Sequence, residues 1–389
     1  MTFAAPLASD PAPVANFVRS EAVPQGVRDE ATGLTVPRGF KINVFAEDLD
    51  GPRRIVIAPG ATTTHYDVFV AESRANRVRV LREVNGDGVF DSVAVFSDKF
   101  NQPYGIAFHP SGYLYVGDTD AVVRLPYTES QTQSNEQPQE VTQLTRGGYN
   151  QHWTRNVLFS DDSKKLYVTI GSSCNVCEES DTQRAAISVM NPDGSDRRLY
   201  ASGLRNPVGL QWHDGRLWTA VNGRDWLGDN TPPDTFTAVR DGGFYGWPYA
   251  YTDLKRKVTA DPDFGGKAPD KVKATLPATV PVQAHSAALG LAFYPKNLPQ
   301  GAKPFPAEYQ GSAFLAYHGS WNRDTKTGYK IVRVAFKNGS PTSITDFVTG
   351  FLNGTSVSGR PVDVAVAPDG ALLFSDDQGG KVWRVSREE

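Results

Sequence analysis

Six copies of a two-strand pattern limit the folds open to this chain. The copies begin near Pro52, Pro103, Arg155, Pro207, Ala288 and Pro361. In each copy an alternating apolar stretch reaches a Pro, Asp or Gly turn, and a second apolar stretch ends in small or polar residues. The first four copies start 51 or 52 residues apart, and the later intervals are 81 and 73 residues. A strand-only repeat of about 50 residues is typical of propeller blades, and surface loops accommodate the longer intervals.

We therefore predict an all-β chain that forms a six-bladed β-propeller with four-stranded antiparallel blades. The 36 Gly and 27 Pro residues agree with many turns, and no long segment keeps a helical period. The segment GFKINVFAED (39–48) is expected to close the ring by pairing with the C-terminal KVWRVS. Residues 1–32, which are rich in Ala and Pro, are predicted to be a flexible segment ahead of a propeller domain spanning 33–389.

Charge and hydropathy exclude two classes of partner. The formal net charge is −3, which does not suit a nucleic-acid-binding protein. The chain has no apolar run of 18 residues, so no membrane span is expected.

The two cysteines, Cys174 and Cys177, form a Cys-x-x-C pair. Zinc would need further Cys or His ligands at a suitable spacing, and the sequence offers none. We predict a local disulfide, with two buried free thiols as the alternative.

Polar residues recur where the repeats join. Because the inner strands of a propeller converge on a central channel, these residues should meet at one mouth of it. The junctions hold Gln102, His152, Arg155, Arg205, Asn206, Arg224, Asp225, His285, His318, Trp321, Arg323 and Arg360. Converging Arg and Asn side chains predict an anionic, planar ligand held by bidentate hydrogen bonds. His152 is a candidate catalytic base, with a structural histidine as the alternative, and Trp321 has core packing as its alternative.

Several motifs together resemble one enzyme family. The chain contains QHWTRN, GLRNPVG, GGFYGWPYAY, HGSWNR and GRPVDVAVAPDG. This set resembles the PQQ-dependent sugar dehydrogenases, and within them the sorbosone and pyranose dehydrogenase branch, relatives of soluble quinoprotein glucose dehydrogenase. The resemblance extends over residues 33–386 and implies a six-bladed propeller, as the repeats do.

The resemblance also implies roles for individual residues. His152 matches the general base that takes the hydroxyl proton while hydride leaves the sugar for the quinone. Calcium is implied as a second cofactor, held by the backbone carbonyls of Gly223 and Arg224, with Asp225 as a further metal residue. The implied cofactor-binding residues are Arg155, Arg205, Asn206, Arg224, His285, His318, Trp321, Arg323 and Arg360, and Gln102 lies near a substrate-binding position.

The chain departs from the family pattern at two positions. Ser172 stands where the family has an aspartate that orients the histidine, and Val362 replaces a second arginine. A serine cannot stabilise an imidazolium by charge, so the base should be tuned differently. These departures favour the sorbosone or pyranose branch over glucose dehydrogenase.

Two other function classes remain open at this point. A calcium-dependent propeller lactonase or hydrolase would use Glu, Asp and Asn as metal ligands, and a non-enzymatic binding propeller would need no cup of His and Arg. For the dehydrogenase, the expected partners are a small-molecule sugar and an electron acceptor such as a cytochrome or a quinone pool. The resemblance and the Cys pair predict a periplasmic or secreted protein.

Overall fold

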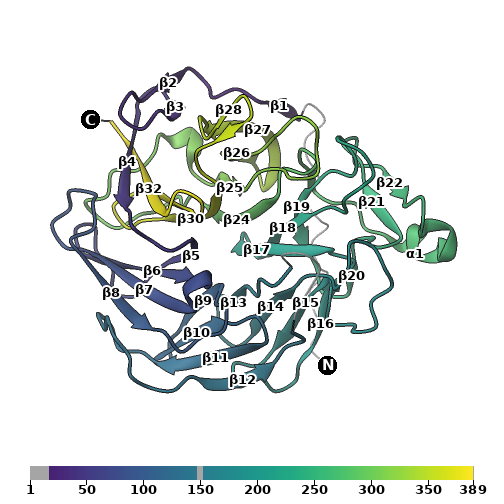
Figure 1. The fold of residues 1–389 in the computed structure, drawn as a ribbon, viewed down its shortest axis with the longest axis horizontal. Helices are drawn as coiled ribbons and strands as arrows, with labels where there is room; N and C mark the ends of the chain where they lie inside the picture. Colours follow the sequence, from purple (N-terminus) through teal and green to yellow (C-terminus); the bar gives the residue numbers. More distant parts are fainter. Residues whose placement is uncertain (1–16, 147–151, 389) are drawn as a thin grey trace.

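The computed structural model describes residues 17–146 and 152–388, which form six sheets arranged around a common centre (Figure 1). Each sheet contains four antiparallel strands, which confirms the predicted six-bladed propeller. Blade 1 contains β5 (Pro52–Ile57), β6 (Tyr66–Glu72), β7 (Arg77–Glu83) and β8 (Ser92–Ser97). Blade 2 contains β9 (Gly105–His109), β10 (Tyr113–Gly117), β11 (Ala121–Pro126) and β12 (Gln139–Gln143). Blade 3 contains β13 (Val157–Phe159), β14 (Leu166–Ile170), β15 (Ala186–Met190) and β16 (Arg198–Ser202).

The other three blades follow the same order from the centre outward. Blade 4 contains β17 (Asn206–His213), β18 (Arg216–Asn222), β19 (Thr235–Val239) and β23 (Val280–Pro281). Blade 5 contains β24 (Ala288–Phe293), β25 (Ala313–Tyr317), β26 (Lys330–Lys337) and β27 (Ser340–Val348). Blade 6 contains β30 (Pro361–Val366), β31 (Leu372–Asp376), β32 (Lys381–Arg387) and β4 (Phe40–Ala46). The pairing of β4 with β32 confirms the predicted closure of the ring, and Figure 1 shows the purple strand beside the yellow one.

In the described residues, additional short strands, one short helix and three 3-10 turns lie outside the four-stranded blades. A fifth, parallel strand extends two blades: β20 (Gly243–Phe244) pairs with β16, and β1 (Val18–Ser20) pairs with β27. The long interval after blade 4 holds β21 (Ala250–Thr252), β22 (Val258–Ala260) and α1 (Pro269–Ala274), and the later one holds β28 (Leu352–Asn353) and β29 (Ser356–Val357). Single 3-10 turns span Ser73–Ala75, Gly265–Lys267 and Ala307–Tyr309.

The segment expected to be flexible, residues 1–32, is described only from residue 17 onward. In that part, β1 pairs with blade 5 and β2 (Gly26–Arg28) pairs with β3 (Thr35–Pro37). The rest of that expectation lies outside the described residues. Within the described ranges, no helix is long and apolar enough to cross a membrane.

Burial follows each strand's place in its blade. The second strands β6, β14 and β25 are buried along their whole length, because neighbouring blades cover both of their faces. The outer strands β8 and β12 are largely exposed. The core is therefore a ring of apolar clusters between the blades.

The first strand of each blade lines the centre, and consecutive first strands contact one another around the ring. Glycine permits the closest of these contacts. A Cβ on Gly209 would lie 2.3 Å from the carbonyl oxygen of Leu289, far inside van der Waals contact. Four first strands, β5, β17, β24 and β30, also carry a register shift near their start, and such a bulge redirects side chains.

Candidate active site

One cavity of about 580 Å³ lies where the first strands begin, and we call it the central cavity. It gathers nine of the residues predicted from sequence: His152, Arg205, Asn206, Gly223, Asp225, His285, His318, Trp321 and Arg360. It also contains Asn222, the last residue of β18, and three polar side chains that were not predicted from the sequence: Arg53, Thr154 and Asp234. The predicted convergence of polar residues from several blades is therefore present.

The imidazole of His152 is buried and held at its Nδ1 atom. Nδ1 lies 3.0 Å from the Ser172 hydroxyl and 3.2 Å from the Ser172 carbonyl oxygen. Because that hydroxyl donates to the carbonyl of Cys174 at 2.6 Å, it can only accept from Nδ1, which must carry the hydrogen. The basic lone pair of neutral His152 is therefore on Nε2.

Burial lowers the pKa of His152 well below its ordinary value, and the positive charge of Arg205 lowers it further. The hydrogen bond with the Ser172 backbone opposes this shift without reversing it. His152 is therefore neutral at neutral pH, as a general base must be.

Arg205 is buried and bound on several sides. Its guanidinium donates to the carbonyl of Gly223 at 2.6 Å and to the carboxylate of Asp225 at 2.8 Å. It also donates to the carbonyl and the side-chain oxygen of Asn175, at 3.0 Å each. Asn175 in turn accepts from the Asp225 amide, so the same loop fixes both charged residues.

Asn206 begins β17 beside this cluster. Its amide nitrogen donates to the side chain of Asn222 at 3.0 Å. Its side-chain oxygen is buried and has no hydrogen-bond partner among the described residues.

Three ionisable side chains from blades 5, 6 and 1 form a second cluster at the cavity. His318 Nε2 lies 3.0 Å from Asp377, which also forms an ion pair with Arg53. Burial lowers the pKa of His318 to about 4 in spite of the carboxylate, so this histidine is neutral. Burial opposes ionisation of Asp377, but His318 and Arg53 together hold its pKa below its ordinary value.

Arg360 contributes a positive charge that is not paired with a carboxylate in the described part of the chain. Its guanidinium donates to the carbonyls of His318 and Gly319, at 3.1 and 3.3 Å. Burial lowers its pKa from the ordinary arginine value, yet arginine stays charged at neutral pH.

His285 and Asp234 complete the lining. His285 Nε2 lies 2.9 Å from the carbonyl of Gly228, on the loop that follows β18. Asp234 accepts from the amides of Gly223 and Ala287, at 2.8 Å each. Burial raises the pKa of Asp234 to about 6.

Four predicted site side chains lie outside the central cavity. Arg155 is fully buried and donates to backbone carbonyls, including those of His152 and Thr154. Arg224 forms ion pairs with Asp261 and Asp263 in a neighbouring hollow. Arg323 donates to the carbonyls of Asp229 and Thr325. Gln102 is exposed, and its backbone N–H donates to the side-chain oxygen of Asn76.

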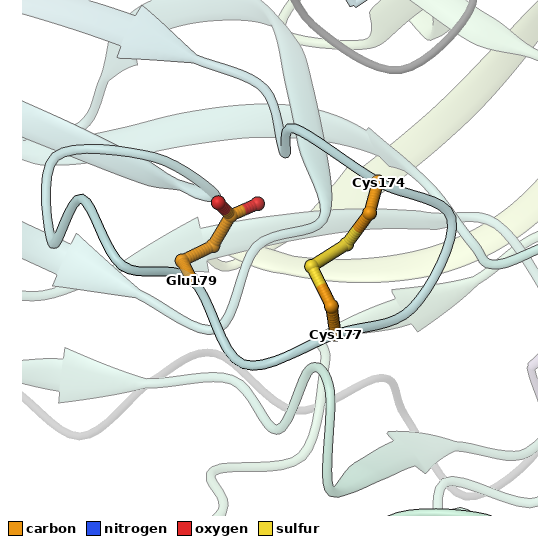
Figure 2. Close-up of side chains that lie close together, drawn as sticks. All are labelled: Cys174, Cys177 and Glu179. Carbon is orange, nitrogen blue, oxygen red and sulfur yellow. A yellow bond between two sulfur atoms is a disulfide. The ribbon is translucent and has the colours of Figure 1, made fainter.

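The predicted disulfide between Cys174 and Cys177 is present (Figure 2). Glu179 lies on the same loop, where it accepts from the amide and hydroxyl of Ser173. These three side chains come close enough to share a metal ion, but sulfurs joined in a disulfide are not thiolate ligands. The loop instead carries Ser172 and Asn175, which orient His152 and Arg205.

The lining fits a planar cofactor with carboxylates, such as PQQ. Arg53, Arg205 and Arg360 place three guanidinium groups around one cavity. Arg53 shares its carboxylate partner Asp377 with His318, and among the described residues the Arg360 guanidinium donates to neutral carbonyls. Guanidinium groups with unused donors bind carboxylates strongly, and the cavity volume suits a cofactor of that size.

Calcium fits less well at the predicted ligands. Both the Gly223 carbonyl and the Asp225 carboxylate bond to Arg205, whose charge repels a cation. Within residues 17–146 and 152–388, the one close group of three potential ligands is the Cys174, Cys177 and Glu179 set. A calcium ion at Gly223 and Asp225 would have to compete with the guanidinium of Arg205, and calcium at this loop stays a prediction from the sequence.

Comparisons with known sequences identify the family of the chain and two related proteins. A family model described as TrAA12-like matches residues 34–388. The chain is 29% identical to an uncharacterized protein of Borreliella burgdorferi over 379 residues, covering 92% of this chain and 91% of that protein. It is 25% identical to the pyrroloquinoline quinone-dependent pyranose dehydrogenase of Coprinopsis cinerea over 421 residues, covering 91% of this chain. The match covers 54% of that enzyme, so the chain spans about half its length.

Solved structures share the fold. The iodide structure of the Trichoderma reesei family AA12 enzyme superposes with a TM-score of 0.77 at 20% identity, covering 95% of this chain and 99% of that one. The holo PQQ domain of the Coprinopsis cinerea pyranose dehydrogenase gives a TM-score of 0.73 at 22% identity, covering 95% of this chain and 100% of that domain. The similarity extends over nearly the whole propeller.

Proposed function

Because this chain belongs to the TrAA12-like family, we propose that it is a PQQ-dependent oxidoreductase that oxidises a pyranose, an aldose or a sorbosone-like sugar aldehyde. The observation that carries the proposal is a buried, neutral imidazole that shares one cavity with three guanidinium groups. A relative and a structural neighbour of this chain are named as PQQ-dependent pyranose dehydrogenase, which supports the choice of cofactor and substrate class.

The cofactor-holding residues in this proposal differ in part from those predicted from sequence. Arg205 and Arg360 remain, and Arg53 joins them because it lines the same cavity. Arg155 and Arg323 are replaced in this role, since their guanidinium groups bond to backbone carbonyls outside the cavity. Bound PQQ would supply the hydride acceptor, while the protein supplies position and charge.

His152 is the proposed general base. Its Nε2 takes the proton of a sugar hydroxyl while the carbon that bears this hydroxyl loses its hydride. The imidazole of His152 becomes positively charged. The Ser172 hydroxyl and carbonyl hold Nδ1 throughout and keep Nε2 as the accepting atom. Burial of the ring limits water at the site, and the proton later leaves to solvent.

We assign no step to calcium, because Arg205 engages two of its predicted ligands. A calcium-dependent hydrolase would use Glu, Asp and Asn as metal ligands. In the described residues, no three His, Cys, Asp or Glu side chains of the central cavity lie close enough together to share an ion.

The test is reconstitution of the purified protein with PQQ, followed by an absorbance titration and dye-linked sugar oxidation. The wild type should take up PQQ and oxidise at least one aldose or sugar aldehyde. His152→Ala should still bind PQQ, and its turnover should fall by about 100-fold to 10,000-fold. Replacing the exposed His65 by Ala is the matched control and should change neither quantity.

Two results would overturn the proposal. Failure of the wild type to bind PQQ would remove the cofactor assignment. Near-normal turnover of His152→Ala with saturating sugar would return His152 to a structural role, and the base would then be sought at His285 or His318.

A further inference from the structure

A second hollow adjoins the central cavity, and the mechanism above does not use it. Its volume is about 440 Å³, and it lies between the loop after β18 and the loop after β25. We call it the rim cleft, and it is lined by Trp226, Gly228, Asp229, Trp321, Asn322, Arg323 and Asp324.

Two tryptophans are exposed at this cleft. Trp226 is 65% exposed and Trp321 is 57% exposed, whereas the chain's other five tryptophans are buried or half-buried. Their rings meet edge to face, with centroids 5.4 Å apart and planes at 83°. Two large apolar side chains are thus presented to solvent at perpendicular angles, which core packing does not explain.

The backbone holds Trp226 in a costly conformation. Its φ is 68°, in the left-handed region that a bulky residue rarely adopts. Residues held in such conformations cluster at active sites and ligand-binding segments, where the surrounding structure holds them. A glycine would adopt this conformation without strain, but the position presents an exposed indole ring instead.

Hydrogen bonds connect the two loops that form the rim cleft. Arg323 donates to the carbonyl of Asp229 at 2.7 Å, and the Asp324 amide lies 3.3 Å from both Asp229 carboxylate oxygens. The two loops are therefore joined by hydrogen bonds as well as by the indole pair. Asn322 adds an amide to the same lining.

The rim cleft and the central cavity share part of their walls. Trp321 lines both hollows. Gly228 lines the rim cleft, and its carbonyl bonds to His285 on the wall of the central cavity. A ligand that extends out of the central cavity would therefore meet the two indole rings.

The lining chemistry is that of a carbohydrate site. The C–H groups of a pyranose face carry partial positive charge and pack on the negative face of an indole. Its hydroxyls would find carboxylate, amide and guanidinium partners around the rings. A concave hollow of this volume holds a small molecule, whereas a protein partner needs a broader face.

We propose that the rim cleft binds the second sugar unit of an oligosaccharide whose reacting unit occupies the central cavity. This inference rests on the proposed function for the reacting unit. It names a disaccharide or longer saccharide as the preferred substrate class.

The experiment compares Trp226→Ala with the wild type, using PQQ-loaded protein. The probes are cellobiose, maltose and lactose, each measured beside glucose and galactose. Trp226→Ala should lower kcat/KM for at least one disaccharide by about tenfold, and monosaccharide values should stay unchanged. Trp226→Phe should retain most of the preference, and Leu254→Ala, an exposed apolar residue outside the cleft, is the matched control.

A binding measurement separates this proposal from the proposed function. Calorimetric titration of disaccharide into the wild type and Trp226→Ala needs no turnover. Weaker binding by Trp226→Ala supports the rim cleft even if no sugar is oxidised, in which case only the proposed function fails.

Three results would overturn the rim-cleft proposal. The first is equal disaccharide binding by both proteins, and the second is no disaccharide binding by the wild type. The third is unchanged sugar kinetics with a raised KM for a protein electron acceptor, which would make the cleft a protein docking site.

Discussion

The Nδ1 atom of His152 lies 3.0 Å from the hydroxyl of Ser172, so a neutral side chain orients the proposed base. A carboxylate at this position would draw a proton onto the imidazole and raise its pKa. With serine there, burial and Arg205 prevail and the pKa of His152 falls. The base should therefore stay active at lower pH than a histidine paired with an aspartate.

This relationship predicts the pH dependence of turnover. A base acts when neutral, so activity is present above the pKa of His152 and is lost as the pH falls through it. In the wild type the acid limb should lie below about pH 6.5, the ordinary histidine value. Ser172→Asp should move that limb upward by about 1–3 pH units, because a nearby opposite charge raises a histidine pKa by that order.

The measurement is kcat against pH for the PQQ-loaded wild type and Ser172→Asp. Ser172→Ala serves as the control, since it removes the hydroxyl without adding charge. Its acid limb should stay at low pH while its kcat falls. Superimposable profiles for the wild type and Ser172→Asp would contradict the orienting role of Ser172.

Arg360 provides the cleanest test of cofactor binding. Within residues 17–146 and 152–388, its guanidinium donates to the carbonyls of His318 and Gly319 and to no carboxylate, so removing it leaves none of their carboxylates unpaired. Arg360→Ala should keep the fold and weaken PQQ binding by about 2–4 kcal/mol, as expected for a lost buried charge contact. Absorbance titration gives the affinity, and thermal unfolding checks the fold.

The matched control is Arg216→Ala. Arg216 begins β18, at the opposite end of the strand from Asn222 on the cavity wall. PQQ affinity should be unchanged in this variant. Equal losses of affinity in both variants would show that net charge, and not a direct contact, controls binding.

Calcium alone should bind poorly to the cofactor-free protein. Arg205 engages the Gly223 carbonyl and the Asp225 carboxylate, so a cation would have to displace its guanidinium. Millimolar calcium should therefore leave the Tm of the wild type unchanged. Arg205→Ala frees both oxygens, and calcium should raise the Tm of that variant, because binding to the folded state stabilises it.

Magnesium is the control cation, since it prefers a stricter octahedral geometry than this loop offers. A rise in wild-type Tm with calcium, as large as in Arg205→Ala, would show that Arg205 does not compete for these ligands. Calcium would then return to the site as predicted from the sequence.

The sequence was informative about the fold because the repeat determines it. Alternating strands at a 50-residue period fix the number of blades, and β4 was recognisable as the closing strand from its own alternation. The convergence of His152, Arg205, His318 and Arg360 followed from their equivalent places in the repeats. The convergence of side chains at equivalent positions of several blades can therefore be predicted from the sequence alone.

Side-chain direction was harder to predict, and Arg53 shows why. In β5 the register shifts between Pro52 and Ile55, so strict alternation fails at the two residues between them. Arg54 bonds to buried Asp363, while Arg53 lines the cavity. Three of the first strands have a proline just before the register shift, namely Pro52, Pro207 and Pro361. The proline is therefore a sequence signal for the shift.

Arg155 illustrates the opposite problem. It stands beside His152 in a motif, yet its guanidinium satisfies backbone carbonyls in the interior. Sequence proximity to a site residue does not show which way a side chain turns. Only the burial of the whole segment, which depends on neighbouring blades, decides it.

The last prediction concerns stability and His318. Burial lowers its pKa to about 4 in the folded protein, while the unfolded chain should have the ordinary value near 6.5. Above pH 6.5 both states are neutral at this residue. As the pH falls from 6.5 to 4 the unfolded state alone takes up the proton, so the free energy of unfolding should decrease, by about 3 kcal/mol for this residue. His318→Gln keeps a hydrogen-bond donor for Asp377 but does not titrate, so its stability should fall less steeply over that range. Urea unfolding at a series of pH values measures the slopes, with His65→Gln, at an exposed histidine, as the control. Equal slopes for the wild type and His318→Gln would show that His318 is not a neutral, buried group in the folded protein.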